Sequence, residues 1–313
     1  MIYIFSESND TTTDGVIQSL INRNADHVRM DLDLNYLGID FGLNNFSDIE
    51  IRIYYGEYEY LINKQDSIWF RRGNISSYLF LNNQYNLIYQ TFIANEKRAL
   101  EEFIVRYLRN NFFCIGNPLI FSCSKLDVLY FAIRCGFRIP RTFLTYKRSS
   151  LEKVGLTKFV AKPIGDILFQ KIGSELHHTY VEKYKLCEIN QYFGNTLFQE
   201  FYSSESEIRV LTVLDNIFAV ELCFKNKSHV DSRHSTNSDV NYNKVFLSAE
   251  IKRQIIELNY LMNTNMSIID FIKISDGSLL LIDFNPCGQY EEIRDYCFPE
   301  IDDVISKILY EKS

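Results

Sequence analysis

The sequence lacks the segments that would insert a protein into a membrane or direct it across one. No apolar run approaches the roughly 18 residues of a membrane-spanning helix. The chain opens without a basic stretch, and the apolar residues 2–5 are followed at once by the polar residues 6–10. A signal peptide needs a longer apolar core. We therefore predict a buried strand at residues 2–5 and no membrane as a partner.

Cysteines are present, but no two of them form a C-x-x-C pair. Their number, seven, is odd. This pattern argues against a disulfide framework and against a zinc knuckle. A protein without disulfides suits a reducing compartment, so we predict a location in the cytoplasm.

An excess of positive charge is also missing. The formal net charge is −7, with 40 Asp and Glu against 33 Lys and Arg. Proteins that bind nucleic acids generally carry a basic surface. The composition therefore argues against nucleic acid as a general partner.

The 313 residues contain no internal repeat and no low-complexity linker, so the domains are expected to pack together. Hydrophobic periodicity predicts a βαβ opening made of strand 2–5, helix 14–21 and strand 28–32. Two alternating runs within residues 49–61 predict a hairpin on the same sheet, and residues 95–109 predict a helix. The predicted fold class is α/β (α+β).

A Gly-Asn-Pro turn that ends at Pro118 predicts a domain boundary. After it, residues 124–135 have the pattern of a helix that stops at Gly136, and residues 138–142 are expected to extend into a strand.

The most informative segment is an apolar run, residues 279–282, that leads into Asp283 and Asn285. Strand side chains alternate, so these two oxygen-bearing groups lie on one face. An Asp-Gly turn within residues 275–278 predicts a hairpin that brings Asp270 beside them. Oxygen ligands without His or thiolate suit Mg²⁺. The alternative is that Asp283 and Asn285 merely end a strand before an Asn-Pro turn.

Two lysines are candidate phosphate ligands. Lys162 ends a buried strand-like run and precedes a loop that contains Gly165 and Gly173. A lysine beside a glycine-containing loop can neutralise nucleotide phosphates. Lys125 is a candidate for a second phosphate contact. The alternative for each is an ordinary solvated surface lysine.

Residues 196–202 have the composition of a purine hinge, in which the backbone hydrogen-bonds the base and apolar side chains cover the ring. Shortly after, alternation places Glu207 and Arg209 on one strand face, suited to ribose hydroxyls and to a phosphate. The alternative for that pair is a cross-strand ion pair. Asp231 and Arg233 lie in a polar loop, residues 226–243, long enough to suggest a function.

Taken in order, these segments resemble the ATP-grasp ligase pattern over roughly residues 120 to 290. Within that superfamily the chain is similar to the peptide maturases that build graspetides, of the microviridin and grasp-with-spasm types. The segments that carry the subfamily resemblance are Trp69-Phe70-Arg71-Arg72, Asp231-Ser232-Arg233 and Asp283-Phe284-Asn285-Pro286-Cys287-Gly288-Gln289-Tyr290.

The resemblance implies three parts: an N-terminal α/β domain at residues 1–118, a central subdomain at 119–196 and a C-terminal subdomain at 197–313. ATP and Mg²⁺ would bind between the last two. The implied partner is a ribosomally made precursor peptide with a leader and a core, and the implied assembly is a homodimer. The implied reaction activates an Asp or Glu side chain as an acyl phosphate, which a Thr, Ser or Lys side chain attacks to give an ω-ester or ω-amide crosslink.

The resemblance also implies roles for individual residues. Lys125 and Lys162 would hold the α- and β-phosphates, Arg209 would meet the transferring phosphoryl group, Gln199, Glu200, Phe201 and Tyr202 would form the adenine hinge, Glu207 would bind ribose, and Asp270, Asp283 and Asn285 would hold Mg²⁺. Arg233 would hold the acceptor carboxylate, and Asp231 would orient it or help to deprotonate the nucleophile. Many ATP-grasp enzymes have Glu where this chain has Asp283, so the number of metal ions stays open.

Two other functions fit the sequence. The first is an ATP-grasp carboxylate–amine ligase that adds amino acids to a small molecule or to a protein C-terminus. The second is a nucleotide-binding scaffold without catalysis.

Overall fold

The computed structural model describes most of the chain. The residues outside the description are 36, 43–49, 74, 76–86, 166–168, 173–174, 179–181 and 225–239. The described chain divides into two compact units. The first contains Met1–Phe121, Thr264–Met266 and Pro286–Ser313, and the second contains Ser122–Asn263 and Ser267–Asn285. The finer three-part division at residues 118 and 196 stays a prediction.

The first unit is built on a parallel sheet in the order β2-β1-β6-β7. Its strands are β1 (Ile2–Ser6), β2 (His27–Asp31), β6 (Ser67–Phe70) and β7 (Phe113–Ile115). Helix α1 (Thr11–Asn22) joins β1 to β2. The predicted βαβ opening is therefore confirmed.

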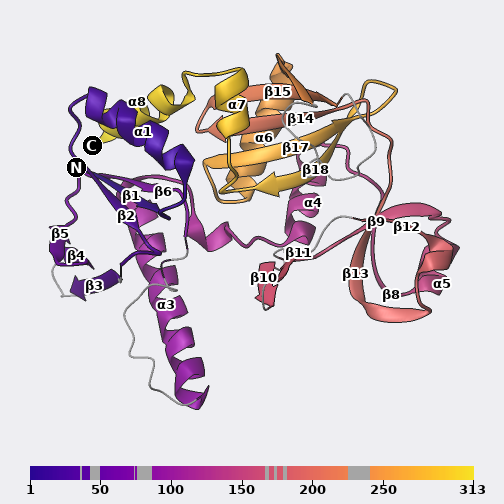
Figure 1. The fold of residues 1–313 in the computed structure, drawn as a ribbon, viewed down its shortest axis with the longest axis horizontal. Helices are drawn as coiled ribbons and strands as arrows, with labels where there is room; N and C mark the ends of the chain where they lie inside the picture. Colours follow the sequence, from indigo (N-terminus) through magenta and orange to yellow (C-terminus); the bar gives the residue numbers. More distant parts are fainter. Residues whose placement is uncertain are drawn as a thin grey trace. The chain divides into compact units, whose positions relative to one another are not determined.

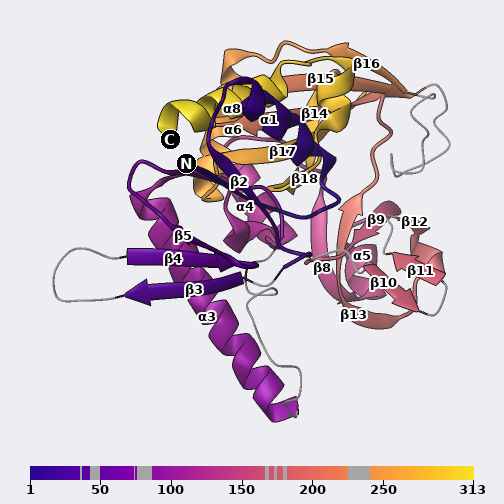
Figure 2. The ribbon, with the colours of Figure 1, turned by 60° about the vertical axis from the view of Figure 1, so that its left-hand side comes forward.

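The predicted hairpin is present, but its expected place on that sheet is wrong. Strands β4 (Glu50–Tyr55) and β5 (Tyr58–Leu61) pair around Gly56, which has a φ of +62°. They form a separate three-stranded antiparallel sheet with β3 (Leu37–Gly42) (Figure 2). Hydrophobic alternation indicates that a segment is a strand. It does not indicate which strand will pair with it, because pairing depends on packing against distant residues.

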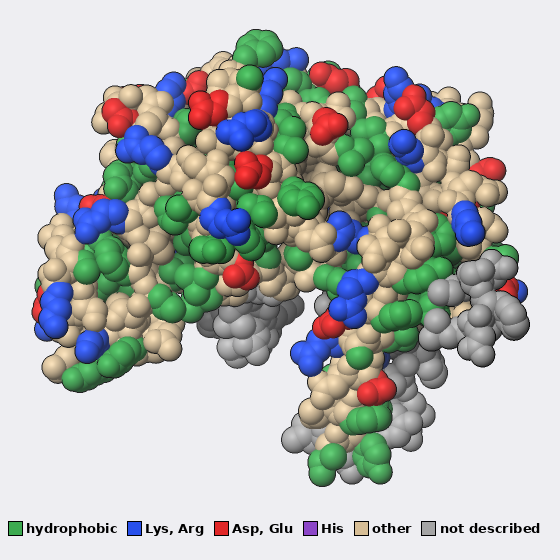
Figure 3. Space-filling view, turned by 180° about the vertical axis from the view of Figure 1, so that it is seen from behind, with side chains coloured by type: hydrophobic (Ala, Val, Ile, Leu, Met, Phe, Trp, Pro, Cys, Tyr) green, Lys and Arg blue, Asp and Glu red, His purple; other side chains and the backbone are tan. Residues whose placement is uncertain are grey.

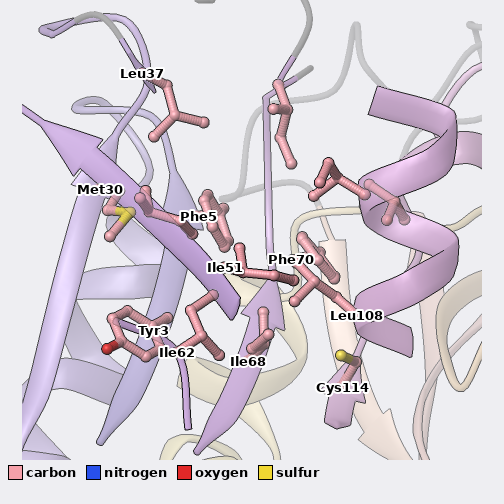
Figure 4. Packing of buried hydrophobic residues seen from close by; sticks show 14 of the residues in the cluster. Tyr3, Phe5, Met30, Leu37, Ile51, Ile62, Ile68, Phe70, Leu108 and Cys114 are labelled. Atoms are coloured by element: carbon pink, nitrogen blue, oxygen red, sulfur yellow. The ribbon is translucent and has the colours of Figure 1, made fainter. Parts of the chain in front are cut away.

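Helix α3 (Leu87–Asn111) contains the predicted residues 95–109, but it begins earlier and ends later than predicted. Its buried residues, including Leu108, pack in one core with side chains of the parallel sheet and of β4 (Figure 4). In that core Phe5 and Phe70 stack with their ring centroids 5.3 Å apart. Alternate residues of the two strands thus lie in this core, Tyr3 and Phe5 from β1 and Ile68 and Phe70 from β6.

The C-terminal residues return to the first unit. Helices α7 (Glu291–Tyr296) and α8 (Ile301–Lys312) form there, and α8 packs on α1 and β6. The Ser67 hydroxyl donates a hydrogen bond to the Leu309 carbonyl at 2.9 Å. No helix in the described part of the chain is both long and apolar enough to cross a membrane.

Arg71, in the segment after Trp69, has a structural role in this unit. Its guanidinium is fully buried, and its Nε lies 3.0 Å from a carboxylate oxygen of the equally buried Asp10. Its Nη1 donates to the Cys287 carbonyl at 2.7 Å, and the guanidinium lies 5.9 Å from the ring centroid of Tyr290. Arg71 therefore connects Asp10, near the start of the unit, with Cys287 and Tyr290 in its C-terminal segment.

In the second unit, α4 (Lys125–Arg134) begins at the N-cap Ser124 and stops before Gly136, as predicted. Gly136 has a φ of +87°, which favours glycine. Residues 138–142 extend into a strand, as predicted, but the regular strand begins only at Thr142, and Arg138 makes an isolated bridge. Pro140, within that stretch, has no N–H to give to a sheet.

A small antiparallel sheet follows, in the order β12-β9-β13-β8. Its strands are β8 (Thr142–Lys147), β9 (Lys158–Lys162), β12 (Glu182–Lys185) and β13 (Tyr192–Glu200). Helix α5 (Arg148–Lys153) packs on one face through a core that contains Leu151, Phe159 and Phe198. Two short strands, β10 (Phe169–Ile172) and β11 (Glu175–His178), pair separately, and the 3-10 turns are η1 (Pro118–Ile120) and η2 (Leu186–Glu188).

The larger sheet of the second unit has five strands (Figure 1). In spatial order they are β16 (Val240–Lys244), β15 (Asn216–Phe224), β14 (Ser206–Val213), β17 (Met266–Lys273) and β18 (Leu279–Asn285). Side chains of α4 and of α6 (Ala249–Leu261) share the core on one face. Residues 240–243, which were expected to belong to a loop at 226–243, pair with β15 instead, and residues 226–239 lie outside the described residues.

Candidate functional site

The predicted hairpin forms from β17 and β18. Gly277 has a φ of +79°, and its N–H donates to the Ile274 carbonyl at 2.8 Å. The register places Asp270 directly opposite Asp283. Asn285 is two residues further along β18, so it lies on the same face. The structure therefore brings together the three oxygen donors that the sequence selects.

The register of this hairpin contains a bulge that the sequence pattern did not reveal. It shifts between Asp270 and Phe271, so that Phe271 faces Leu281 and Ile282 is an extra residue. The Ile282 carbonyl accepts a hydrogen bond from Lys162 Nζ at 2.9 Å. Bulges re-aim strands next to functional sites, and here the extra residue connects the hairpin to the end of β9.

Both carboxylates are paired with cations. Lys125 Nζ lies 2.6 Å from Asp283 Oδ1. Arg209 contacts both oxygens of Asp270, with Nε 2.9 Å from Oδ1 and Nη2 3.4 Å from Oδ2. The four side chains are between 20% and 42% exposed, so each pair contributes only about 0.2–1 kcal/mol to stability. The two ion pairs therefore orient the side chains of the site but contribute little to the stability of the fold.

The contacts of Arg209 and of the two lysines bear on their predicted roles. The cross-strand ion pair that was the alternative for Arg209 is present, and Lys125 and Lys162 contact protein oxygens. All three cations nevertheless converge on β17 and β18. Their roles toward phosphates stay predictions.

The donor set of the hairpin fits a hard divalent cation. Two carboxylates and the amide of Asn285 are ligands of the kind that Mg²⁺ takes together with water and phosphate oxygens. Among the described residues, no group of three His, Cys, Asp or Glu side chains is close enough to hold a metal. A metal at Asp270 and Asp283 would therefore complete its shell with Asn285 and with oxygens from a ligand.

The hinge segment consists of Gln199 and Glu200, the last two residues of β13, and of Phe201 and Tyr202, which follow the strand. The Glu200 N–H donates to the Arg141 carbonyl at 2.8 Å, and the Phe201 N–H donates to the Lys158 carbonyl at 3.1 Å. The Tyr202 N–H has no hydrogen-bond partner within the described residues. Tyr202 therefore differs from Glu200 and Phe201, whose N–H groups are bonded to main-chain carbonyls.

Side-chain contacts fix the hinge further. The Tyr202 hydroxyl donates to a Glu200 carboxylate oxygen at 3.0 Å. Burial, and then this hydrogen bond, raise the pKa of Tyr202. Lys183 Nζ lies 3.8 Å from the ring centroid of Phe201, within cation–π range.

Gln199 is buried and has one unsatisfied polar atom. Its Nε2 donates to the Thr142 hydroxyl at 3.2 Å, and that hydroxyl donates to the Pro140 carbonyl at 2.7 Å. Its Oε1 has no partner among the described residues. Gln199 pairs with Val160, so alternation places it on the same sheet face as Lys162. An unsatisfied acceptor of this kind favours a ligand that donates a hydrogen bond.

The remaining predicted residues divide into two groups. Glu207 and Arg209 share a face of β14, as alternation predicted, and the ribose role of Glu207 stays a prediction. Asp231 and Arg233 lie outside the described residues. Their predicted contacts with a peptide carboxylate and a nucleophile therefore stay predictions.

One contact at the site carries no signal in the sequence. The backbone N–H of Lys125 donates to the Ile164 carbonyl at 2.9 Å, which ties the start of α4 to the loop after β9. A helix N-terminus leaves its first N–H groups unpaired within the helix, so such a partner is expected, but its position 39 residues along the chain is set by the fold.

On the opposite face of the large sheet, Glu221 accepts a hydrogen bond from Ser206 at 2.6 Å and lies 3.3 Å from Lys273 Nζ. The hydrogen bond from Ser206 is the main reason that the pKa of Glu221 is lowered. This lysine–carboxylate pair lies on the helix-covered face of the sheet, opposite the face that carries Asp270 and Asp283.

No protein-family model matches the sequence, and no curated protein matches it either. Solved structures do. A RiPP-associated ATP-grasp ligase from Chryseobacterium gregarium, in complex with ADP and a leader and core peptide, is 16% identical with a TM-score of 0.77, and the match covers 100% of this chain and 97% of that one.

Two other ligases match over nearly the whole chain. The macrocyclase MdnC from Microcystis aeruginosa MRC, bound with the precursor peptide MdnA, is 17% identical with a TM-score of 0.74 and 99% coverage of both chains. The ATP-grasp ligase PsnB, in complex with a phosphomimetic variant of a minimal precursor, Mg and ADP, is 13% identical with a TM-score of 0.72, covering 99% of this chain and 98% of that one. The chain therefore has the ATP-grasp fold, as the resemblance implied.

Proposed function

We propose that this protein is an ATP-dependent ligase that crosslinks side chains of a ribosomal precursor peptide. In the proposed reaction, an Asp or Glu side chain of the peptide becomes an acyl phosphate. A Thr or Ser hydroxyl, or a Lys amine, of the same peptide then forms an ω-ester or ω-amide bond. ATP and Mg²⁺ are the proposed cosubstrate and metal.

One observation carries this proposal: cations and oxygen donors converge at the β17–β18 hairpin of an ATP-grasp fold. Lys125 contacts Asp283, Arg209 contacts Asp270, and Lys162 contacts the Ile282 carbonyl. A triphosphate brings several negative charges to one place, and its binding needs both cationic side chains and a metal. The hairpin supplies groups for both needs.

The chemistry consists of two substitutions. A carboxylate oxygen of the peptide attacks the γ-phosphorus of ATP, the bond from that phosphorus to the bridging oxygen breaks, and ADP leaves. The nucleophilic hydroxyl or amine then attacks the acyl carbon and loses its proton, and inorganic phosphate leaves. Both steps bring negatively charged groups together, so the protein contributes mainly by positioning and by neutralising charge.

We assign the charge neutralisation to named residues. Lys125 and Lys162 hold the α- and β-phosphates, and Arg209 stabilises the charge on the transferring group. When bound, Mg²⁺ would be held by Asp270, Asp283 and Asn285 and would neutralise phosphate oxygens. The contacts of Lys125, Arg209 and Lys162 with residues of β17 and β18 support this assignment.

The hinge assignment rests on two polar groups at the end of β13 and just after it that have no partner among the described residues. The Tyr202 amide meets the adenine ring, Gln199 Oε1 accepts from the 6-amino group, and the side chains of Glu200 and Phe201 flank the base. Glu207 binds ribose hydroxyls. The unsatisfied Gln199 Oε1 and the unbonded Tyr202 N–H among the described residues support these contacts.

The peptide side of the proposal rests on the sequence resemblance and on the three solved structures, each of which is a complex with a precursor or a leader and core peptide. Arg233 holds the acceptor carboxylate, and Asp231 orients it or helps to deprotonate the nucleophile. ATP lies between a central part, 119–196, and a C-terminal part, 197–313. A homodimer in the cytoplasm completes the proposal, and the seven free cysteines support a reducing compartment.

Incubation with ATP, Mg²⁺ and a candidate precursor tests the proposal. The precursor sought is a short Thr- and Glu-rich peptide encoded beside this gene. Intact mass spectrometry should show the loss of one water molecule per crosslink, and ADP release should depend on the peptide. Omitting ATP is the control, and tandem mass spectra locate each crosslink.

The alternatives give different results. A carboxylate–amine ligase that adds free amino acids would increase the mass of its acceptor. A nucleotide-binding scaffold would bind ADP but release none from ATP, whatever peptide or metal is added. Either result would overturn the crosslinking proposal.

A further inference from the structure

The contact between Lys125 and Asp283 is the feature of the site that the proposed roles do not explain. Lys125 is expected on a phosphate and Asp283 on a metal, yet the two form an ion pair with Nζ 2.6 Å from Oδ1. Lys162 differs, because it donates to the main-chain carbonyl of Ile282. Lys125 is thus the lysine that contacts a carboxylate of the candidate metal set directly.

The backbone of Lys125 is fixed while its side chain can move. Its N–H donates to the Ile164 carbonyl, and the N-cap Ser124 starts α4 at this point. The ammonium stands at the end of a flexible four-carbon stem. A short swing of that stem changes the partner of the ammonium without moving the helix.

The ion pair is also open to competition. The Lys125 side chain is 22% exposed and that of Asp283 is 42% exposed, so water and ions reach the pair. Ion pairs this exposed are weak and exchange readily. Arg209 and Asp270 make a two-point contact instead, which fixes their relative orientation.

We propose that Lys125 is an exchangeable counter-ion of Asp283, which competes with the divalent metal for that carboxylate until a nucleotide phosphate draws the ammonium away. This inference rests on the proposed function of the site. A metal ion alone must displace Lys125 and binds weakly. A nucleotide gives the ammonium another anion, which leaves Asp283 to the metal.

The consequence is a reciprocal coupling between metal and nucleotide. If a nucleotide increases the affinity for the metal, the metal increases the affinity for the nucleotide by the same factor. The coupling makes the metal and the nucleotide enter together. It also keeps the metal hairpin charge-balanced when neither is bound, because each carboxylate then has its own cation.

Manganese binding measures this coupling without any turnover. Mn²⁺ is titrated into the full-length protein, and the free ion is followed by electron paramagnetic resonance, with and without saturating ADP. In the wild-type protein ADP should increase the affinity for Mn²⁺ by tenfold or more, roughly. Lys125→Met should bind Mn²⁺ alone about fivefold more tightly than the wild type, because its competitor is gone.

Lys273→Met is the matched control. It also removes one lysine that pairs with a carboxylate of the same sheet, Glu221, but on the opposite face. Its affinity for Mn²⁺ should equal that of the wild type, which separates a change in net charge from the loss of a competitor at Asp283. Lys125→Gln serves if the Met variant fails to fold, as judged by circular dichroism.

Two results would overturn the inference. One is a Lys125 variant that binds Mn²⁺ alone no more tightly than the wild type. The other is a variant whose enhancement by ADP equals that of the wild type. Calorimetry with ADP keeps the proposed function separate: a wild type that binds no ADP contradicts the proposed function, whereas normal ADP binding with an unchanged Mn²⁺ affinity in Lys125→Met contradicts the counter-ion alone.

Discussion

Arg209 and Asp270 meet across neighbouring strands through two nitrogen–oxygen contacts, at 2.9 and 3.4 Å. The arginine comes from β14 and the aspartate from β17, which pairs with β18 to form the hairpin that carries Asp283 and Asn285. Because a planar guanidinium in a two-point contact fixes orientation, Arg209 holds Asp270 in one geometry. The residue proposed for the phosphoryl group and a residue proposed for the metal are therefore positioned by one another.

Arg209→Lys should preserve the fold and abolish most of the turnover. Lysine keeps the charge but loses the fork that contacts both oxygens of Asp270. We expect peptide-dependent ADP release to fall roughly 100-fold or more, as for the loss of one donor to a developing charge. The ADP dissociation constant should change by less than about tenfold.

Arg253→Lys is the control for that change. Arg253 lies on α6 and pairs with Glu257 on an exposed surface. Its substitution should leave turnover unchanged. Equal turnover in Arg209→Lys and the wild type would contradict the assigned role of Arg209.

Asp283→Ala should remove metal-dependent turnover while the protein stays folded. The carboxylate is 42% exposed and its ion pair contributes little to stability, so the melting temperature should fall by only a few degrees, roughly. Turnover is measured as ADP release over a range of Mg²⁺ concentrations. Asp276→Ala, in the exposed turn of the same hairpin, should keep full activity. Ligation retained by the Asp283 variant would remove it from the metal site.

Gln199→Met should weaken the selection of adenine. In the wild type, Oε1 is an acceptor without a partner among the described residues, and the 6-amino group of adenine is a donor. A purine nucleotide without that amino group should bind the wild type about tenfold less tightly than ADP, which is the range of one hydrogen bond.

The Gln199 variant should bind the two nucleotides almost equally, since neither then meets the amide oxygen. Calorimetric titration of both proteins with both nucleotides gives the coupling between the side chain and the amino group. A difference between the nucleotides that survives unchanged in the variant would assign the selection to the hinge backbone.

Asp10→Asn should destabilise the first unit strongly above pH 3.8. Burial by itself raises the pKa of Asp10, but Arg71 and the hydroxyls of Thr12 and Thr13 outweigh it, so the net pKa lies below the ordinary value of 3.8. Removing one partner of a fully buried ion pair costs about 3–5 kcal/mol of unfolding free energy.

The pH dependence of this effect has a defined sign. A carboxyl with a lowered pKa stabilises the fold above its unfolded pKa, and the stabilisation is lost as the pH falls through the folded pKa. The gap between wild type and Asp10→Asn in urea unfolding should therefore be widest near neutral pH and narrow below pH 3.8. Asp14→Asn, whose carboxylate is exposed, is the control. A gap independent of pH would contradict the role of the charge.

The sequence pattern predicted helices and turns correctly where the residues that determine them are neighbours in the chain. Ser124 and Gly136 bracket α4, and Gly277 closes the hairpin, because capping and turn geometry depend on adjacent residues. The segment 138–142 joins the regular strand only at Thr142, and Pro140 within it has no N–H to give to a sheet. The 49–61 hairpin was placed on the wrong sheet because strand pairing is decided by distant residues.

The amino-acid sequence by itself determined that Asp270, Asp283 and Asn285 lie on the two arms of one hairpin, because strand alternation and one turn are local properties. The bulge at Ile282, which sets Asp270 opposite Asp283, is not visible in the pattern. The sequence also contained the ordered set of motifs from which the ATP-grasp fold was predicted. Only the tertiary structure decided the partners of those oxygens. Lys125 reaches Asp283 across 158 residues and Arg209 reaches Asp270 across 61, and contacts over such separations depend on how strands and helices pack, which no local pattern records.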